Sequence, residues 1–357
     1  MIGVSDVSKS FFIRYCFLII VMIFTCFVSY KVMASVINKD ADGEVPVFSE
    51  EKNEARALIS YEDNYELQKY YNDNNLDKKI VDFSNCLHSY ISTKVNENSN
   101  IKNLVSELEN YYNSDSNNFA FYYLDINTGF SVAYNENQKI FGASVLKAPF
   151  VIYVYKQASM GKINLDEELV YTKEFYSKGS GVLQNEEFGK SYSIKELCYY
   201  AIHDSDNVAY KMLADRFGIE NAKEFWKDLG VNSIYDYNAL FSSINAVDAG
   251  RIMKYLYDFS LENDYGKDLM SVFTNALYNF IPKDGLVMAH KSGWANTSIH
   301  DMVIKFDENP YILIVLSKRG EIEFQSLFNF TSEKIGQIHH SFWDENVNYC
   351  LSEFKNN

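Results

Sequence analysis

A serine and a lysine three residues apart, Ser144 and Lys147, form the first pair in this sequence that can do covalent chemistry. They lie in the apolar stretch 142–150, which predicts the start of a buried helix, and at this spacing both side chains share one helix face. A lysine can act as the base for a serine only where burial or a nearby cation lowers its pKa. The pair indicates a nucleophilic serine with a lysine base, although about one or two such pairs are expected by chance in a chain of this length.

Two further motifs follow at longer range, Ser-Asp-Asn at residues 205–207 and Lys-Ser-Gly at residues 291–293. Each has an ordinary structural explanation when taken alone, because Ser-Asp-Asn is a common helix N-cap and Lys-Ser-Gly a common strand end. The three motifs in this order favour a single acyl-transfer site to which each of them contributes.

The elements that must position these motifs follow from hydrophobic periodicity and turn residues. The segments on both sides of the Asn-Thr-Gly turn at residues 127–129 predict a β-hairpin, and helical patterns dominate the middle of the chain. Strands return near the end, before a closing helix. We predict an α+β fold, with an antiparallel sheet flanked by helices and an all-helical subdomain. The predicted strands are 119–125, 130–134, 287–293, 299–306 and 311–317; the predicted helices include 101–112, 193–202, 208–217 and 331–342.

Over residues 101–342 the sequence resembles the class A β-lactamase-like serine hydrolases of the β-lactamase and penicillin-binding protein superfamily. The three motifs, the hairpin before the serine and the segment 179–184 carry the resemblance. It implies that Ser144 attacks an amide or β-lactam carbonyl, with Lys147 as its base or as a charge stabiliser. Ser205 would relay a proton to the leaving nitrogen, and Asn207 would hold Lys147 and bind the substrate's side-chain amide.

The same resemblance assigns substrate binding to the third motif and its surroundings. Lys291 and Ser292, with Thr297 or Ser298, would bind a substrate carboxylate, and the strand through Gly293 would line the site. The backbone N–H groups of Ser144 and Trp294 would form the oxyanion hole, where removing one donor typically costs ~100- to 1,000-fold in rate.

The sequence departs from the family in the step that releases the product. Class A β-lactamases carry a glutamate on an Ω-shaped loop that activates the deacylating water, whereas the corresponding stretch 230–243 has no glutamate and only one acid, Asp236. By resemblance we expect β-lactam hydrolysis, with a D-alanyl-D-alanine carboxypeptidase and a non-hydrolysing penicillin-binding sensor module as alternatives. A glutaminase would share the Ser-x-x-Lys chemistry, but the N-terminal segment described below argues against it.

Charge and histidine usage exclude several classes of function. The formal net charge of -15 argues against a nucleic-acid partner and against docking on anionic lipid through a basic face, because both need a basic surface. The six histidines form no metal-binding motif, so we expect neither a metal nor another cofactor. We expect a monomer that binds a small-molecule β-lactam or a peptidoglycan peptide.

An almost wholly apolar run at residues 15–30 follows two basic residues. It predicts an uncleaved signal anchor in the cell membrane, which we favour because the run is long for a signal-peptide core; the alternative is a signal peptide cut after Ala34. Both place the rest of the chain outside the cytoplasm, either tethered or secreted. We therefore divide the chain into a signal segment (1–35), a polar extracytoplasmic spacer (36–99) and a catalytic domain (100–357).

Three of the five cysteines lie beyond the apolar run, and none has the spacing of a metal site. Cys86 and Cys350 can pair if the two ends of the fold meet. Cys198 lies in an apolar helical pattern and is expected to be a small buried hydrophobe.

Overall fold

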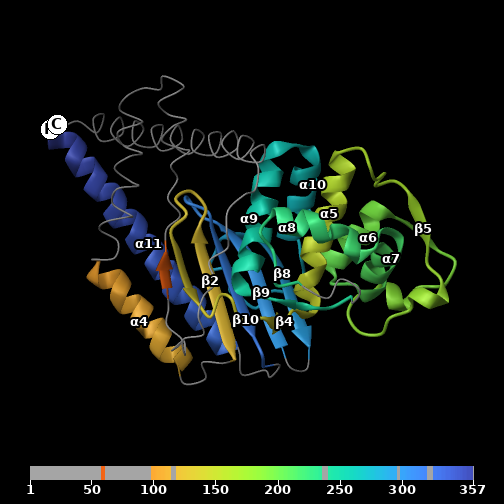
Figure 1. Ribbon diagram of the computed structural model, residues 1–357, viewed down its shortest axis with the longest axis horizontal. Coiled ribbons are helices and arrows are strands. Elements are labelled where there is room, and N and C mark those ends of the chain that lie inside the picture. The colour runs from red at the N-terminus through yellow and green to blue at the C-terminus, as the bar shows by residue number, and fades with distance from the viewer. Residues whose placement is uncertain are drawn as a thin grey trace, which may run out of the picture.

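Strands near residue 120 and near residue 315 pair with one another, as the sequence predicts. The computed structural model describes residues 58–60, 98–113, 118–234, 240–295, 298–319 and 325–356. Its main sheet is antiparallel and has six strands in the order β1-β3-β2-β10-β9-β8 (Figure 1). These strands are β1 (Leu58–Ser60), β3 (Ser131–Tyr134), β2 (Phe119–Asp125), β10 (Tyr311–Ser317), β9 (Ser298–Phe306) and β8 (Val287–Ala295).

The β2–β3 hairpin closes through the predicted turn. The Asp125 carboxylate accepts hydrogen bonds from the backbone N–H and the hydroxyl of Thr128, and Gly129 adopts φ 77°, a conformation that glycine reaches without steric cost. Strand β10 then pairs with β2 along its whole length, from Tyr311 opposite Asp125 to Ser317 opposite Phe119. The antiparallel core of the sheet therefore joins residues that are 186 (311 − 125) to 198 (317 − 119) positions apart in the sequence.

Both faces of the sheet are covered by helices. Because successive side chains of a strand point to opposite faces, each strand contributes to two cores. On one face, Phe121 of β2 and Leu313 of β10 join a core with helices α4 (Ser99–Asn113) and α11 (Gln325–Asn356). On the other face, Ala120 of β2 and Ile314 of β10 join a larger core, to which the helical subdomain described below and three further helices contribute. These are α5 (Lys147–Ser159), α9 (Ala246–Glu262) and α10 (Asp264–Thr274) (Figure 1).

A helical subdomain extends from this second face, farthest from α4 and α11 (Figure 1). Its helices α6 (Ile194–His203) and α7 (Asn207–Phe217) begin at strong N-caps: Ser193 forms a capping box with Glu196, and the Asp206 carboxylate accepts from the N–H groups of Val208 and Ala209. The remaining short elements are β4 (Ile140–Phe141), β5 (Glu168–Val170), β6 (Ser191–Ser193), β7 (Ser243–Ile244), α8 (Lys223–Asp228) and the 3-10 turns η2 (Ala143–Leu146), η3 (Lys173–Phe175), η4 (Leu183–Asn185) and η5 (Ile219–Ala222).

The predicted α+β class with a helical subdomain is confirmed, and the closing helix is longer than predicted at both ends. The closing helix, predicted over residues 331–342, runs from Gln325 to Asn356 in α11. Its first residues pack on the sheet through Phe328, and tertiary packing of this kind extends helices beyond the segment with clear periodicity.

The predicted signal segment, almost all of the predicted spacer and Cys86 lie outside the described residues. Among the described helices, none is both long enough and apolar enough to cross a membrane. Cys350 is disulfide-bonded, whereas Cys198 is free and buried, as expected.

Candidate active site

Ser144 lies on the 3-10 turn η2, which runs directly into α5 at Lys147. Residues i and i+3 eclipse one another in a 3-10 turn, so the two side chains lie on one side of it. Ser144 is half-buried and Lys147 is fully buried. Ala143, just before the serine, has φ 46°, which is a costly conformation for a residue with a side chain and is often found where a fold holds a reactive group.

The Lys147 amine is fixed by the second motif. Its Nζ donates to the carbonyl of Ser205 at 2.5 Å and to Oδ1 of Asn207 at 2.8 Å, and it lies 3.3 Å from Oγ of Ser205. Burial and the nearby Lys291 ammonium lower the pKa of Lys147 well below its usual range. A neutral amine has two N–H groups and one lone pair; the two acceptor-only oxygens can take the N–H groups and leave the lone pair for a hydroxyl.

The Ser205 hydroxyl lies between two lysines. Oγ of Ser205 is 3.0 Å from Nζ of Lys291 and 3.3 Å from Nζ of Lys147. Lys291 also donates to the carbonyl of Ser292 at 2.8 Å, and burial lowers its pKa to about 7. This arrangement can pass a proton through the hydroxyl of Ser205 between either amine and a substrate atom.

Asp206, the middle residue of the second motif, has a positioning role. One carboxylate oxygen accepts from the N–H groups of Val208 and Ala209, and the other accepts from the N–H of Leu183 at 2.8 Å. These three bonds anchor the start of α7 while Ser205 adopts φ 54°. The strained backbone at Ser205 turns its carbonyl toward Lys147, and this energetic cost is borne by the surrounding hydrogen bonds.

Strand β8 carries the third motif along the edge of the sheet beside η2. Gly293 packs so closely against this turn that a Cβ atom added to it would lie 3.0 Å from the amide nitrogen of Ser144. Ser292 and Ser298 are buried, Trp294 is 66% exposed, and Thr297 lies outside the described residues. The structure therefore brings together Ser144, Lys147, Ser205, Asn207, Lys291 and Gly293.

His300 is a positioning residue to which the sequence assigned no role. It is fully buried on β9, opposite Gly293 in the strand register. Its Nε2 lies 2.7 Å from the carbonyl of Phe141, and its Nδ1 accepts from the N–H of Ser317. These contacts require an imidazole protonated at Nε2 alone, and burial lowers the pKa of His300 to about 4. His300 therefore ties the sheet to the segment just before Ser144 while remaining neutral.

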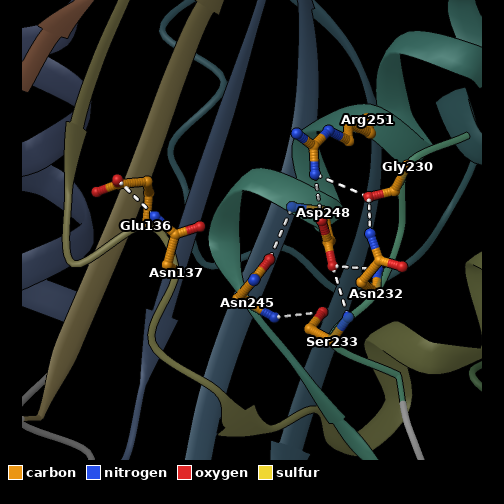
Figure 2. Close-up of polar contacts among 8 residues, drawn as sticks. All are labelled: Glu136, Asn137, Gly230, Asn232, Ser233, Asn245, Asp248 and Arg251. Carbon is orange, nitrogen blue, oxygen red and sulfur yellow. Dashed lines mark hydrogen bonds and ion pairs between the residues drawn. The ribbon is translucent and has the colours of Figure 1, made fainter. Parts of the chain in front are cut away.

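Figure 2 shows the polar network around residues 230–233, which begin the stretch where class A enzymes carry their deacylating glutamate. Asp248 of α9 is buried and accepts from the N–H groups of Asn232 and Ser233, and it pairs with Arg251. The hydroxyl of Ser233 in turn accepts from the N–H of Asn245. Asp248 is therefore fully engaged as an anchor of the stretch and is not free to activate water. Asp236 lies outside the described residues.

Within the described part of the chain, no group of three or more His, Cys, Asp or Glu side chains has an arrangement that could hold a metal ion. The side chains that meet around Ser144 carry hydroxyl, amine and amide groups. Buried hydroxyl and amine groups in this arrangement suit acyl transfer through a serine.

The three layers and the order of the motifs place the chain in the β-lactamase and penicillin-binding protein class of folds. A family model described as the Beta-lactamase enzyme family matches residues 101–343, and the chain belongs to that family. The resemblance predicted from the sequence is thereby confirmed. Comparison with curated proteins gives no match.

Solved structures of a penicillin-binding protein and of β-lactamases share this fold. A mutant of PBP-A, solved as an acyl-enzyme complex with penicillin G, superposes with a TM-score of 0.61 at 20% identity, covering 67% of this chain and 97% of that one. An ancestral class A β-lactamase gives a TM-score of 0.58 at 18% identity, covering 67% and 99%. A β-lactamase from Sphaerobacter thermophilus gives 0.56 at 17% identity, covering 68% and 96%. At these identities the likeness concerns the fold.

Proposed function

We propose that this protein is a serine hydrolase that forms an acyl-enzyme on Ser144 with β-lactams or with peptides of the D-alanyl-D-alanine type. The observation that carries the proposal is the Ser205 hydroxyl held between the amines of Lys147 and Lys291. This arrangement supplies both a base for the nucleophile and an acid for the leaving group. Family membership supports the same reaction class.

Acylation uses groups that the site already holds in place. Neutral Lys147 takes the proton of the Ser144 hydroxyl, and Oγ of Ser144 forms a bond to the carbonyl carbon of the substrate. The carbonyl π electrons move onto oxygen, where the backbone N–H groups of Ser144 and Trp294 stabilise the negative charge. The C–N bond then breaks, and its nitrogen takes a proton from Ser205, which is resupplied by Lys147.

Substrate binding uses the remaining groups of the second and third motifs. The Lys291 ammonium attracts a substrate carboxylate, with help from the buried hydroxyls of Ser292 and Ser298. Asn207 keeps Lys147 in place through Oδ1, and its amide Nδ2 remains as a donor toward a substrate carbonyl.

Deacylation is the slow step of the proposed reaction. The carboxylate of Asp206 raises the pKa of Lys147, but Asp206 is committed to three backbone amides. Asp248 is likewise occupied by two amides and by Arg251. Within the described residues, neither carboxylate is free to activate water. This favours a long-lived β-lactam adduct, as expected of a peptidase or a penicillin-binding sensor, over rapid β-lactam turnover.

We propose that the protein acts outside the cytoplasm and is attached to the cell membrane by the apolar segment 15–30. The disulfide at Cys350 supports this location, because disulfides persist in oxidising compartments. Labelling of intact cells with a membrane-impermeant fluorescent penicillin tests the location: labelling of the parent but not of Ser144→Ala is expected, and labelling only after lysis contradicts it.

The reaction is tested by stopped-flow and mass-spectrometric time courses with penicillin G and nitrocefin, using Ser144→Ala as the control. We expect an adduct on Ser144 that persists for minutes or longer, and no adduct in the control variant. Rapid turnover without accumulation would contradict slow deacylation. An intact fold that forms no adduct with either compound, and that releases no D-alanine from a D-alanyl-D-alanine peptide, would rule out the proposed function.

A further inference from the structure

A short turn with two glycines, residues 179–181, packs against the second motif and is called here the glycine turn. The backbone N–H of Asn207 donates to the carbonyl of Ser180 at 3.1 Å, and the hydroxyl of Ser180 donates to the carbonyl of Asp204 at 3.2 Å. A Cβ atom added to Gly179 would lie 2.9 Å from Nδ2 of Asn207. The turn is therefore in direct contact with the side chain that would bind the substrate amide.

The glycine turn has a backbone conformation that needs external support. Gly179 has φ 132° and Gly181 has φ 102°, a region that only glycine occupies readily. Because glycine also has the most conformational freedom to lose, such a turn is mobile unless other groups hold it. Ser180 and Val182 are exposed, so packing on the solvent side does not supply that support.

The side-chain amide of Gln184 supplies this support with three hydrogen bonds. Its Oε1 accepts from the N–H of Gly179 at 3.1 Å, and its Nε2 donates to the carbonyls of Gly179 at 2.6 Å and of Gly181 at 2.9 Å. Donor and acceptor are both needed, so among side chains of this length only an amide satisfies the turn. Gln184 itself is held on η4, whose N-terminal residue Leu183 donates its N–H to Asp206.

We propose that Gln184 is a positioning residue that fixes Asn207 by holding the glycine turn in place. This rests on the proposed acylation of Ser144. Without Gln184 the turn loosens, the carbonyl of Ser180 no longer constrains the start of α7, and the amide of Asn207 samples orientations unsuited to Lys147 and to substrate.

The test compares Gln184→Ala and Gln184→Glu with Asn185→Ala, an exposed neighbour on the same 3-10 turn. Gln184→Ala is expected to lower the second-order acylation rate with penicillin G about tenfold. The glutamate variant keeps the acceptor but loses both donors at neutral pH. Its rate relative to the parent should rise as the pH falls to 5, because the protonated carboxyl regains one donor. Asn185→Ala should acylate at the parental rate.

A double-mutant cycle shows whether Gln184 acts through Asn207. In an Asn207→Ala background, the additional effect of Gln184→Ala should disappear, because coupled residues do not act additively. Equal effects of Gln184→Ala in the two backgrounds would overturn the proposal. An unchanged rate for Gln184→Ala in the parent background would overturn it as well.

Hydrogen–deuterium exchange gives a readout that does not depend on acylation. The N–H of Asn207, bound to the carbonyl of Ser180, should exchange faster in Gln184→Ala than in Asn185→Ala, with helix content and melting temperature showing that both variants are folded. Equal exchange in the two variants would contradict the role of Gln184. Absence of any adduct in the parent would instead contradict the proposed function.

Discussion

Substitution of Gly293 by alanine tests how closely strand β8 must approach the nucleophile. A Cβ atom at this position would lie 2.9 Å from the amide nitrogen of Val145, 3.0 Å from that of Ser144 and 3.1 Å from the carbonyl oxygen of Gly142. All three neighbours are backbone atoms, so no side chain can swing aside. The strand and the turn η2 must separate by a few tenths of an ångström.

Two consequences follow from this separation. Overpacking of a well-packed interior costs about 1–3 kcal/mol of unfolding free energy. The separation also moves the amides of Ser144 and Trp294 apart, and these are the proposed oxyanion-hole donors. Loss of one such donor costs ~100- to 1,000-fold in rate, and a misplacement of about 1 Å costs ~100-fold. For a smaller displacement we expect Gly293→Ala to reduce acylation about 10- to 100-fold.

The assay is the second-order rate of Ser144 adduct formation, measured together with urea unfolding. Gly336→Ala is the matched control, because this glycine lies within α11 with nothing within 4 Å of an added Cβ; it should leave the rate unchanged and stabilise the helix by up to about 1 kcal/mol. A folded Gly293→Ala variant that acylates at the parental rate would refute the assignment of the oxyanion hole to this contact.

Three more predictions concern the buried charges of the site. In the parent, acylation should be lost as the pH falls through the lowered pKa of Lys147, and Lys147→Ala should lose ~100-fold or more at every pH; a parental rate in this variant would exclude the lysine as base. Binding of a substrate carboxylate should be full below pH 7 and lost above it, as Lys291 with its pKa of about 7 deprotonates. Asp301→Asn should move that loss to lower pH, because the carboxylate of Asp301 favours the charged form of Lys291. Competition by a matched ester that lacks the carboxylate should not depend on pH in the parent or in Asp301→Asn. Asp206→Ala, which leaves three backbone amides without an acceptor, should lower the urea-unfolding free energy by about 3 kcal/mol, and an unchanged value would contradict its anchoring role.

Part of this protein was predictable because the relevant physics is local. The hairpin around residues 127–129 depends on turn chemistry, and the start of α7 depends on the N-cap at Asp206. The spacing of Ser144 and Lys147 places both on one side of a turn whichever helix type forms. Fold class and family could be recognised from such signals.

Other features depended on contacts that a linear pattern does not encode. The separation of 86 residues between Ser205 and Lys291 does not show that one hydroxyl is shared by two amines. The start of α11 was missed because Leu327 and Phe328 are held there by tertiary packing, which a linear periodicity does not encode. Segment 179–184 and His300 belong to the pattern that resembles the family, but the sequence assigned no role to Gln184 or His300, because a histidine or a glutamine acquires its role only through the backbone groups that it contacts.

The sequence by itself determined which groups are available for the proposed acyl transfer: two serines, two lysines and an asparagine, carried by three motifs. The tertiary structure decided the pKa values of the two lysines and the hydrogen bonds that position these groups. Burial of Lys147 and Lys291 lowers the pKa of both amines, and Asp206, Asp248 and their backbone partners leave these carboxylates without a catalytic role. Desolvation and hydrogen-bond satisfaction are properties of the folded surroundings, so only the fold could set them.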